Sequence, residues 1–231
     1  MISVIIPCYQ DSESISRCLD SVFGQTVKDV EIIVVDDGST DDLRAALRPY
    51  AGRVQVIRQE NRGGNAARNR GFAVSKGEFV MFCDADMRLR RDALEKLLTA
   101  LATHPEAAYA YSSFRFGWKL FRSGPFDPAH LRRVNFISTT SLIRRASFPG
   151  FDESLRRFQD WDLWLTMLER GATGVWVPMT LFRAEVKRGR ISAWLPKDLY
   201  RVPWRRLGWL PKRIDDYEKA ALIVRRKHGI L

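Results

Sequence analysis

The stretch EIIVVDDGST, residues 31–40, combines a strand with the polar loop that follows it. Its residues 32–35 are all β-branched aliphatics. An uninterrupted run of this kind is typical of a strand buried on both faces of a sheet. Asp36 and Asp37 come directly after the run, and Gly38 and Ser39 then turn the chain. The sequence therefore predicts a strand over 31–35 that carries two carboxylates at its carboxyl end.

Similar apolar runs lie on both sides of this stretch, with helical spacing of apolar residues between them. The predicted strands are 2–7, 31–35, 54–57 and 79–83, and the predicted helices are 15–23, 41–47, 66–74 and 92–101. Alternation of short apolar strands with helices is typical of a parallel sheet covered on both faces. We therefore predict an α/β fold with a Rossmann-like, mainly parallel sheet and helices on both faces.

The pattern is less regular after residue 105. The strands predicted here are 109–116, 138–143 and 174–177, and the helices are 158–170 and 215–228. Beyond Phe182 the composition changes to Trp, Pro, Arg and Lys. We therefore divide the chain into a main domain, 1–182, and a basic, tryptophan-rich helical extension, 183–231.

The formal net charge of +11 is unevenly distributed over the 231 residues. Residues 183–231 hold 14 Lys and Arg against 5 Asp and Glu, whereas 1–182 hold 24 against 22. This asymmetry indicates two regions with different partners. No apolar run approaches the ~20 residues of a membrane-spanning helix, and no signal peptide is visible. Cys8, Cys18 and Cys83 match no zinc pattern, so we expect reduced thiols and a cytoplasmic protein.

Polar residues follow three of the predicted strands: Tyr9, then Asp36 and Asp37, then Asp84-Ala85-Asp86. The carboxyl ends of parallel strands meet at one edge of a sheet, where such folds bind ligands. The carboxylates of Asp84 and Asp86 suit Mg²⁺ or Mn²⁺, which also bind waters and substrate phosphates. The alternative is a plain turn with a helix-capping aspartate.

The segment 61–69 places Gly63 and Gly64 before a predicted helix that contains Arg68. The N-terminus of a helix with a nearby arginine can receive phosphate oxygens, although two glycines are equally consistent with a plain loop. The segment matches neither the dinucleotide-binding fingerprint nor a P-loop. Both mismatches count against a dehydrogenase and against a kinase-like NTPase.

Together these motifs resemble the family 2 glycosyltransferases, a large inverting family with the GT-A fold, over about residues 1–180. The resemblance is carried by SVIIPCY at 3–9, SVFGQT at 21–26, the strand and loop from Glu31 to Ser39, 63–71, Asp84-Ala85-Asp86, 151–153 and QDWDLW at 159–164. It implies a nucleotide-binding half, 1–104, and an acceptor half, 105–182. The family usually has Asn where this chain has Gln10, and Glu where it has Gln159.

The resemblance also implies roles for individual residues. Tyr9 would lie against the nucleobase, Asp37 would hydrogen-bond it, and Asp86 would bind Mn²⁺ or Mg²⁺. Asp160 would be the catalytic base; otherwise it is a helix-start acid favoured by the helix dipole. Trp161 and Asp162 are candidates for the acceptor side, although helical spacing favours core packing for Trp161. The remaining nucleotide-sugar contacts would come from Pro7, Arg68, Asp84 and Ala85.

These roles predict an inverting transferase that moves a sugar from a nucleotide sugar, expected to be a UDP-sugar, to a hydroxyl group. The acceptor would be a glycan or lipid-linked glycan in cell-envelope polysaccharide or glycolipid synthesis. One alternative is a sugar nucleotidyltransferase, which normally has a glycine-rich, arginine-containing loop where this chain has 7–10. The other is a non-catalytic nucleotide-sugar-binding module, which the retained Asp86 and Asp160 disfavour.

The extension 183–231 contains Trp194, Trp204 and Trp209 among its Lys and Arg residues, with Arg205-Arg206 between two of the tryptophans. Basic residues mixed with tryptophan suit a membrane surface with anionic headgroups. They also suit a helical extension that packs its tryptophans on the main domain. No nucleic-acid-binding module is recognisable, so we expect no nucleic-acid partner. The membrane alternative places the protein at the inner face of the membrane as a peripheral protein.

Overall fold

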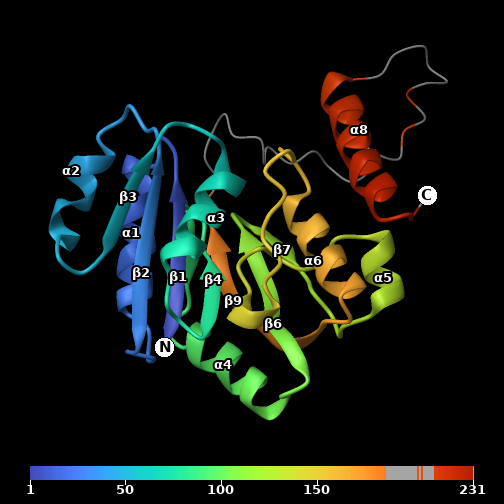
Figure 1. Cartoon of the computed structure of the whole chain (residues 1–231), viewed down its shortest axis with the longest axis horizontal. Helices are drawn as coiled ribbons and strands as arrows, with labels where there is room; N and C mark the ends of the chain where they lie inside the picture. The colour runs from blue at the N-terminus through green and yellow to red at the C-terminus, as the bar shows by residue number, and fades with distance from the viewer. Residues whose placement is uncertain (186–201, 203, 205–210, 231) are drawn as a thin grey trace. The chain divides into compact units, whose positions relative to one another are not determined.

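The computed structural model describes residues 1–185, 202, 204 and 211–230 of the chain. The chain divides into two compact units, Met1–Glu185 and Val186–Leu231. The first unit is built on a nine-stranded sheet (Figure 1). Its strands run in the order β3-β2-β1-β4-β8-β6-β9-β5, and β7 pairs with β6 beside this path.

The first half of this unit is parallel, as predicted. Strands β1, β2, β3 and β4 all pair in parallel, with β1 between β2 and β4. Its elements are β1 (Ile2–Cys8), α1 (Ser12–Phe23), β2 (Val30–Asp37), α2 (Leu43–Leu47), a 3₁₀ turn (Arg48–Tyr50), β3 (Gln55–Gln59), α3 (Gly64–Val74) and β4 (Phe79–Phe82). The carboxyl ends of these strands therefore lie at one edge, the carboxyl edge of the sheet.

The second half makes the sheet mixed, because β8 is antiparallel to both of its neighbours, β4 and β6. Strand β9 pairs in parallel with β6 and then antiparallel with β5. The elements are β5 (Met87–Leu89), α4 (Ala93–Thr103), β6 (Ala107–Phe116), β7 (Lys119–Phe121), α5 (Pro128–Arg133), β8 (Leu142–Arg144), a 3₁₀ turn (Arg145–Ser147), α6 (Gln159–Glu169) and β9 (Thr173–Ala184). Of these, β5, β7 and α5 were not predicted, and β9 extends well beyond the predicted strand at 174–177.

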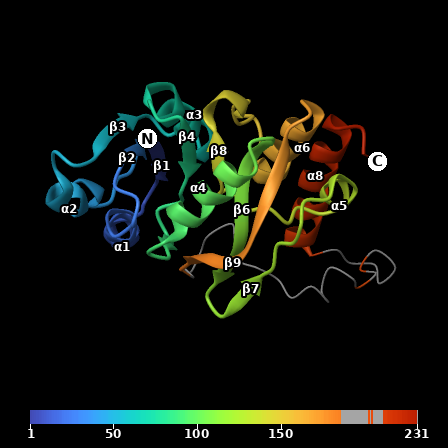
Figure 2. The ribbon, with the colours of Figure 1, turned by 90° about the horizontal axis from the view of Figure 1, so that it is seen from below.

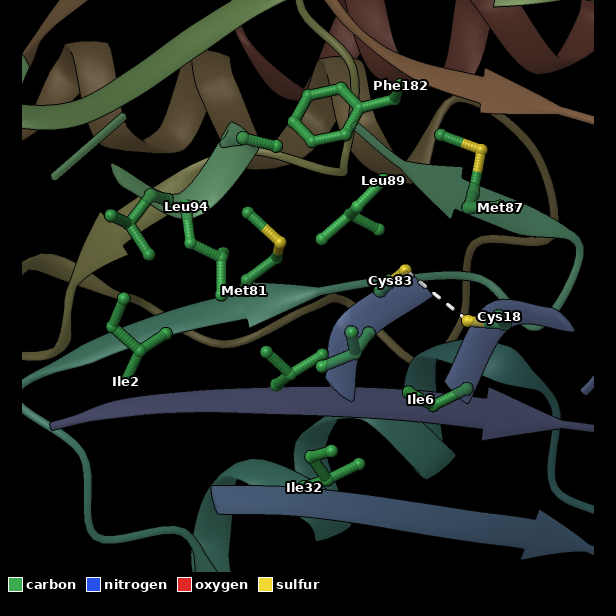
Figure 3. Packing of buried hydrophobic residues seen from close by; sticks show 14 of the residues in the cluster. Ile2, Ile6, Cys18, Ile32, Met81, Cys83, Met87, Leu89, Leu94 and Phe182 are labelled. Carbon is green, nitrogen blue, oxygen red and sulfur yellow. Dashed lines mark hydrogen bonds between the residues drawn. The ribbon is translucent and has the colours of Figure 1, made fainter. Parts of the chain in front are cut away.

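Helices cover both faces of the sheet, and Figure 2 shows α1 and α3 on opposite sides of the strands. Alternate residues of β1 separate the two sides: Ile6 belongs to the core beneath α1 and α4, whereas Ile5 faces α3. Figure 3 shows part of the first core, in which Met81 and Leu94 pack with residues of β1 and β2. Burial of such continuous apolar strands is the main stabilisation expected for a sheet of this kind.

All three cysteines are free and buried, as the sequence analysis expects. Cys18 and Cys83 lie with their sulfur atoms 3.7 Å apart at the end of the same core (Figure 3). The hydrogen bond with Cys18 and burial both raise the pKa of the Cys83 thiol. The Cys83 thiol therefore behaves as a neutral core side chain rather than as a nucleophile.

The described part of the second unit centres on α8 (Lys212–Lys227), where the sequence predicts a helix over 215–228. Ile214 and Val224 are its buried residues, and its last turn holds three basic side chains. Trp194, Trp209 and Arg205-Arg206 lie outside the described residues. Among the helices of the described segments, none has the length and apolar character needed to span a membrane.

Candidate active site

The loop after β1 is attached to the loop after β2 by the side chain of Gln10. Its Oε1 accepts hydrogen bonds from the backbone N–H groups of Thr40 and Asp41, both at 3.0 Å. Gln10 adopts a positive φ of 56°, a conformation that is uncommon outside glycine, asparagine and aspartate. These hydrogen bonds hold that conformation, and Tyr9 beside it is 48% exposed. Tyr9 therefore has the accessible ring that its predicted contact with a nucleobase requires.

Pro7 is buried in β1 and pairs with Val35 of β2. The pairing of β1 with β4 ends two residues earlier, at Ile5 and Phe82. A proline is tolerated here because no β4 partner needs its missing N–H. Pro7 thus lies where the sheet opens toward the carboxyl edge.

Asp36 and Asp37 at the end of β2 are both engaged within the chain. Asp36 accepts from the backbone N–H of Ser39 at 2.8 Å and pairs with Arg58 at 3.0 Å, which is a structural role. Asp37 accepts from the backbone N–H groups of Arg62 at 2.9 Å and Gly63 at 2.8 Å. Asp37 therefore holds the glycine loop that leads into α3. Its predicted hydrogen bond to a nucleobase remains a prediction.

Arg68 connects α3 with the end of β4. Its buried guanidinium donates from Nη2 to Asp84 Oδ1 at 2.6 Å and from Nη1 to Asn65 Oδ1 at 3.3 Å. Within the described residues, the Nε atom of Arg68 is buried without a hydrogen-bond partner. The paired Asp84 carboxylate is 43% exposed. A buried cation and a partly exposed carboxylate therefore lie together at the carboxyl edge.

The Asp84-Ala85-Asp86 segment is a tight turn, closed by the N–H of Met87 bonding to the carbonyl of Asp84 at 2.9 Å. Ala85 is 1% exposed and belongs to the core, so its methyl group anchors the turn. Glu185 donates its backbone N–H to the carbonyl of Asp86 at 3.0 Å. The core contact and this hydrogen bond hold the backbone that carries both aspartates.

The turn fits a divalent ion of the kind that the sequence predicts. In the described ranges, no three His, Cys, Asp or Glu side chains cluster to enclose a metal by themselves. Mg²⁺ is usually held by one or two carboxylates together with waters and substrate phosphates. Asp84 and Asp86, at least one of them partly exposed, supply that number of carboxylates. Binding would thus depend on a phosphate ligand, and it remains a prediction for this chain.

Asp160 lies in the first turn of α6, two residues after Phe158, which has a positive φ of 58°. Asp160 is partly buried as a residue, and desolvation of its carboxyl raises its pKa. The amide of Asn135, the N–H of Trp161 at 2.9 Å from Oδ1 and the charge of Arg68 oppose this shift. Arg68 therefore acts electrostatically on Asp160 while it pairs with Asp84. A carboxyl with this environment is suited to accept a proton.

Trp161 and Asp162, the predicted acceptor-side residues, are both buried at 3% exposure. The indole of Trp161 donates to the carbonyl of Leu131 at 2.7 Å, and its ring contacts Phe158 edge-on. Trp161 thus has the core position that its helical spacing favours. Acceptor binding by these two residues remains a prediction.

Three asparagines that the sequence analysis did not single out contribute to the site. Asn65 and Asn69 of α3 bond the segment before α6, and Asn135 approaches Asp160. The spacing of Asn65 and Asn69 by four residues, around Arg68, was a visible signal for a polar buried helix face. No comparable signal marks Asn135, because it lies in a loop far from α6 in the sequence.

The mixed sheet and its acidic carboxyl edge define the fold of a GT-A type glycosyltransferase. The chain is similar in structure to S. aureus TarS 1–349 in complex with UDP-GlcNAc, with a TM-score of 0.70 and 22% identity over 87% of this chain and 64% of that one. It is also similar to the mannosyltransferase PcManGT from Pyrobaculum calidifontis in complex with GDP-Man and Mn²⁺, with a TM-score of 0.64 and 22% identity over 83% and 59%. These likenesses concern the fold.

The chain belongs to the glycosyltransferases of family 2, because the family described as glycosyl transferase family 2 matches residues 3–159. Chondroitin synthase of Escherichia coli is 30% identical over 189 residues, which cover 74% of this chain and 27% of that protein. Glycosyltransferase GlyG of Streptococcus pneumoniae is 39% identical over 101 residues, or 42% and 34% of the two chains. The chain thus spans about a third or less of the length of these two relatives.

Proposed function

We propose that this chain is an inverting, metal-assisted glycosyltransferase that moves a sugar from a nucleotide sugar to an acceptor hydroxyl. One observation carries the proposal: Arg68 pairs with Asp84 of the predicted metal turn and also influences the carboxyl of Asp160. The predicted metal turn and the segment that leads to the candidate proton acceptor are therefore both bonded to side chains of one helix, α3. The family membership of the chain supports the same reaction class.

The donor in this proposal is a UDP-sugar, bound between Tyr9 and Asp37 at its base and the Asp84-Ala85-Asp86 turn at its diphosphate. Pro7 and Arg68 complete the binding residues. Two structures of similar fold support a nucleotide-sugar donor: the TarS structure contains UDP-GlcNAc, and the PcManGT structure contains GDP-Man with Mn²⁺. Asp84 and Asp86 would hold Mn²⁺ or Mg²⁺ together with the donor phosphates.

Asp160 would take the proton from the acceptor hydroxyl as that oxygen attacks the anomeric carbon of the sugar. A single displacement of this kind inverts the configuration at that carbon. A bound divalent ion would stabilise the negative charge that develops on the departing diphosphate. Arg68 would keep Asp160 available in its charged form, because a nearby cation favours the carboxylate.

The proposed acceptor is a glycan or lipid-linked glycan in the synthesis of cell-envelope polysaccharide or glycolipid. Relatives of this chain include proteins named chondroitin synthase and hyaluronan synthase. The basic extension, 183–231, would bring the site to an anionic membrane surface. Trp161 and Asp162 would shape the acceptor side from beneath, since their side chains are buried.

A thermal-shift screen of nucleotide sugars with Mn²⁺ or Mg²⁺ tests the donor part of this proposal. A stabilising donor should lose its metal-dependent effect in Asp86→Ala. Asp160→Asn should keep donor binding and lose transfer, measured as nucleotide release in the presence of acceptor. Full transfer by Asp160→Asn would remove Asp160 as the base. Donor binding without any sugar release by the wild-type chain would instead identify a binding module.

A further inference from the structure

Two asparagines on α3 hold the segment that precedes the Asp160 helix. Asn69 Nδ2 donates to the carbonyl of Phe151 at 2.9 Å, and Asn69 Oδ1 accepts from the N–H of Phe151 at 2.8 Å. Asn65 Nδ2 donates to the carbonyls of Asp152 at 2.7 Å and Leu155 at 2.9 Å. Two side chains one helical turn apart thus make four hydrogen bonds to the backbone of 151–155.

A salt bridge extends these contacts at the surface. Glu153 pairs with Arg62 at 3.0 Å through Oε2 and accepts from Asn69 Nδ2 at 3.0 Å through Oε1. Arg62 in turn donates its backbone N–H to Asp37. The segment 151–155 is therefore connected, through α3 and the loop before it, to the carboxylate at the end of β2.

The segment needs such support because it contributes no helix or strand of its own between Ser147 and α6. Phe151 packs on Phe82 and Phe148, but that contact anchors only one point of the segment. From Leu155 the chain reaches Asp160 within five residues, passing the positive-φ Phe158. A shift of the segment would therefore move the carboxyl of Asp160 relative to Arg68.

We propose that Asn65 and Asn69 are positioning residues that set the place of the Asp160 carboxyl relative to the donor-binding half of the site. This inference rests on the proposed function. Neither asparagine needs to touch the substrate: both act through the backbone of 151–155, and Glu153 reinforces them from the surface. Asn65 also accepts a hydrogen bond from Arg68, so Asn69 is the variant that isolates the positioning role. Helix α3 thereby joins Asp37, Asp84 and the Asp160 segment, so that the donor contacts and the base share one rigid support.

The test compares Asn65→Ala, Asn69→Ala and Glu153→Ala with Arg70→Ala as a matched control. Arg70 is exposed on the same helix and makes none of these hydrogen bonds. The readouts are the affinity for UDP with Mn²⁺, the kcat and KM for hydrolysis of the donor that the thermal-shift screen selects, and amide hydrogen exchange of 151–160. A displaced catalytic group can cost about 100-fold in rate.

We expect Asn69→Ala to lower kcat by about 10- to 100-fold with donor KM and UDP affinity unchanged, because Asn69 bonds only the segment that leads to the base. Asn65→Ala should lower kcat to a similar extent and also weaken UDP binding, because it removes a hydrogen-bond partner of Arg68 as well. Amide hydrogen exchange should become faster in 151–160 and stay unchanged in the strands. Glu153 is exposed, so Glu153→Ala does not endanger folding. It should lower kcat by less than the asparagine variants do, again with UDP affinity unchanged. Glu153→Gln should recover part of the lost kcat, because its side-chain oxygen still accepts from Asn69.

An unchanged kcat in both asparagine variants, or a parallel loss of UDP affinity and kcat in Asn69→Ala, would overturn the inference in favour of a purely structural role. Failure of the proposed function would look different, since the wild-type chain itself would then bind no nucleotide sugar or would bind one without releasing the sugar. In that case, amide hydrogen exchange measured without ligand still decides whether the side chains of Asn65 and Asn69 hold 151–155. Unchanged exchange there would refute the positioning role independently of any activity.

Discussion

The proposed role of Asp160 requires a charged carboxylate, and burial makes that charged form unfavourable. Its pKa is raised by desolvation, so the folded state binds a proton more tightly than the unfolded chain does. Stability contributed by the protonated form is therefore lost as the pH rises through that raised pKa. A site that must hold a carboxylate at neutral pH thus opposes the stability of the fold that builds it.

This penalty predicts that Asp160→Asn raises the melting temperature at pH 8. Asparagine keeps an oxygen acceptor for the N–H of Trp161 and carries no charge to desolvate. The gain should shrink toward pH 4, where the wild-type carboxyl is increasingly protonated. Melting curves of both proteins at the two pH values measure it, with the exposed Asp42→Asn as a control. A larger gain at pH 4 than at pH 8 would contradict the raised pKa.

Arg68 supplies a second prediction at the residue scale. Its charge lowers the pKa of Asp160, in opposition to desolvation. Replacement by the similarly long, neutral Met should raise that pKa further and shift the acidic limb of the kcat–pH profile to higher pH. The profile is measured at saturating donor, so that weaker binding does not distort it. An acidic limb that stays at the wild-type pH would show that the charge of Arg68 does not act on the proton acceptor.

The residues of the site were predictable where a strand end or a motif displayed them. Asp37, Asp84 and Asp86 follow buried strands, and Asp160 opens a helix with an acidic first turn. The pairing of Arg68 with Asp84 was not predictable, because it depends on how α3 crosses the sheet. The same limit applies to Asn135, which approaches Asp160 only through the packing of the loop between α5 and β8.

At the scale of elements, the position of α3 depends on how closely it packs on the sheet. A methyl group added at Gly71 would lie 2.4 Å from Ile5 Cγ2 and 3.2 Å from Val35 Cγ2. Both neighbours are fully buried core side chains of β1 and β2. The absence of a side chain at Gly71 therefore sets the distance between the sheet and the helix that carries Asn65, Arg68 and Asn69.

We predict that Gly71→Ala destabilises the protein by about 1–2 kcal/mol. Overpacking a core costs about 1–3 kcal/mol, and an approach of 2.4 Å to a buried side chain places this cost in the upper part of that range. The ~1 kcal/mol that alanine gains over glycine in a helix offsets only part of it. Denaturant unfolding measures the difference. Gly124→Ala is the control, because its added methyl group meets no atom within 4 Å. A Gly71→Ala protein at least as stable as the wild type would show that α3 can move away from the sheet freely.

Most elements of the first half were predictable because they are short apolar runs or amphipathic helices, and the parallel sheet follows from their alternation. Helix α3 differs, because its buried residues include Asn65 and Arg68. The second half was less predictable for physical reasons. Strands β5 and β7 have three residues each, too few to show a period. The end of β9 is stabilised by pairing with β5 and β6, so its length depends on distant residues.

At the scale of the whole molecule, the main domain ends after Glu185 rather than after Phe182. Strand β9 continues to Ala184, and the side chain of Glu185 forms salt bridges with Arg17 and Arg88. The hydrogen bond from Arg17, together with the charges of Arg88 and Arg17, lowers the pKa of Glu185. A chain ending at 182 would cut the strand and remove these salt bridges, so a chain ending at Glu185 is the better truncated variant.

We predict that the full chain floats with vesicles of phosphatidylglycerol and phosphatidylcholine, and that residues 1–185 do not. Each Lys or Arg near such a surface contributes about 1 kcal/mol, and 183–231 hold nine more basic than acidic residues. Salt at about 1 M, where the Debye length is ~3 Å, should release the full chain. Retained binding of UDP with Mn²⁺ by 1–185 would show that its fold is intact. Equal, negligible flotation of both proteins would instead favour an extension that packs its tryptophans on protein.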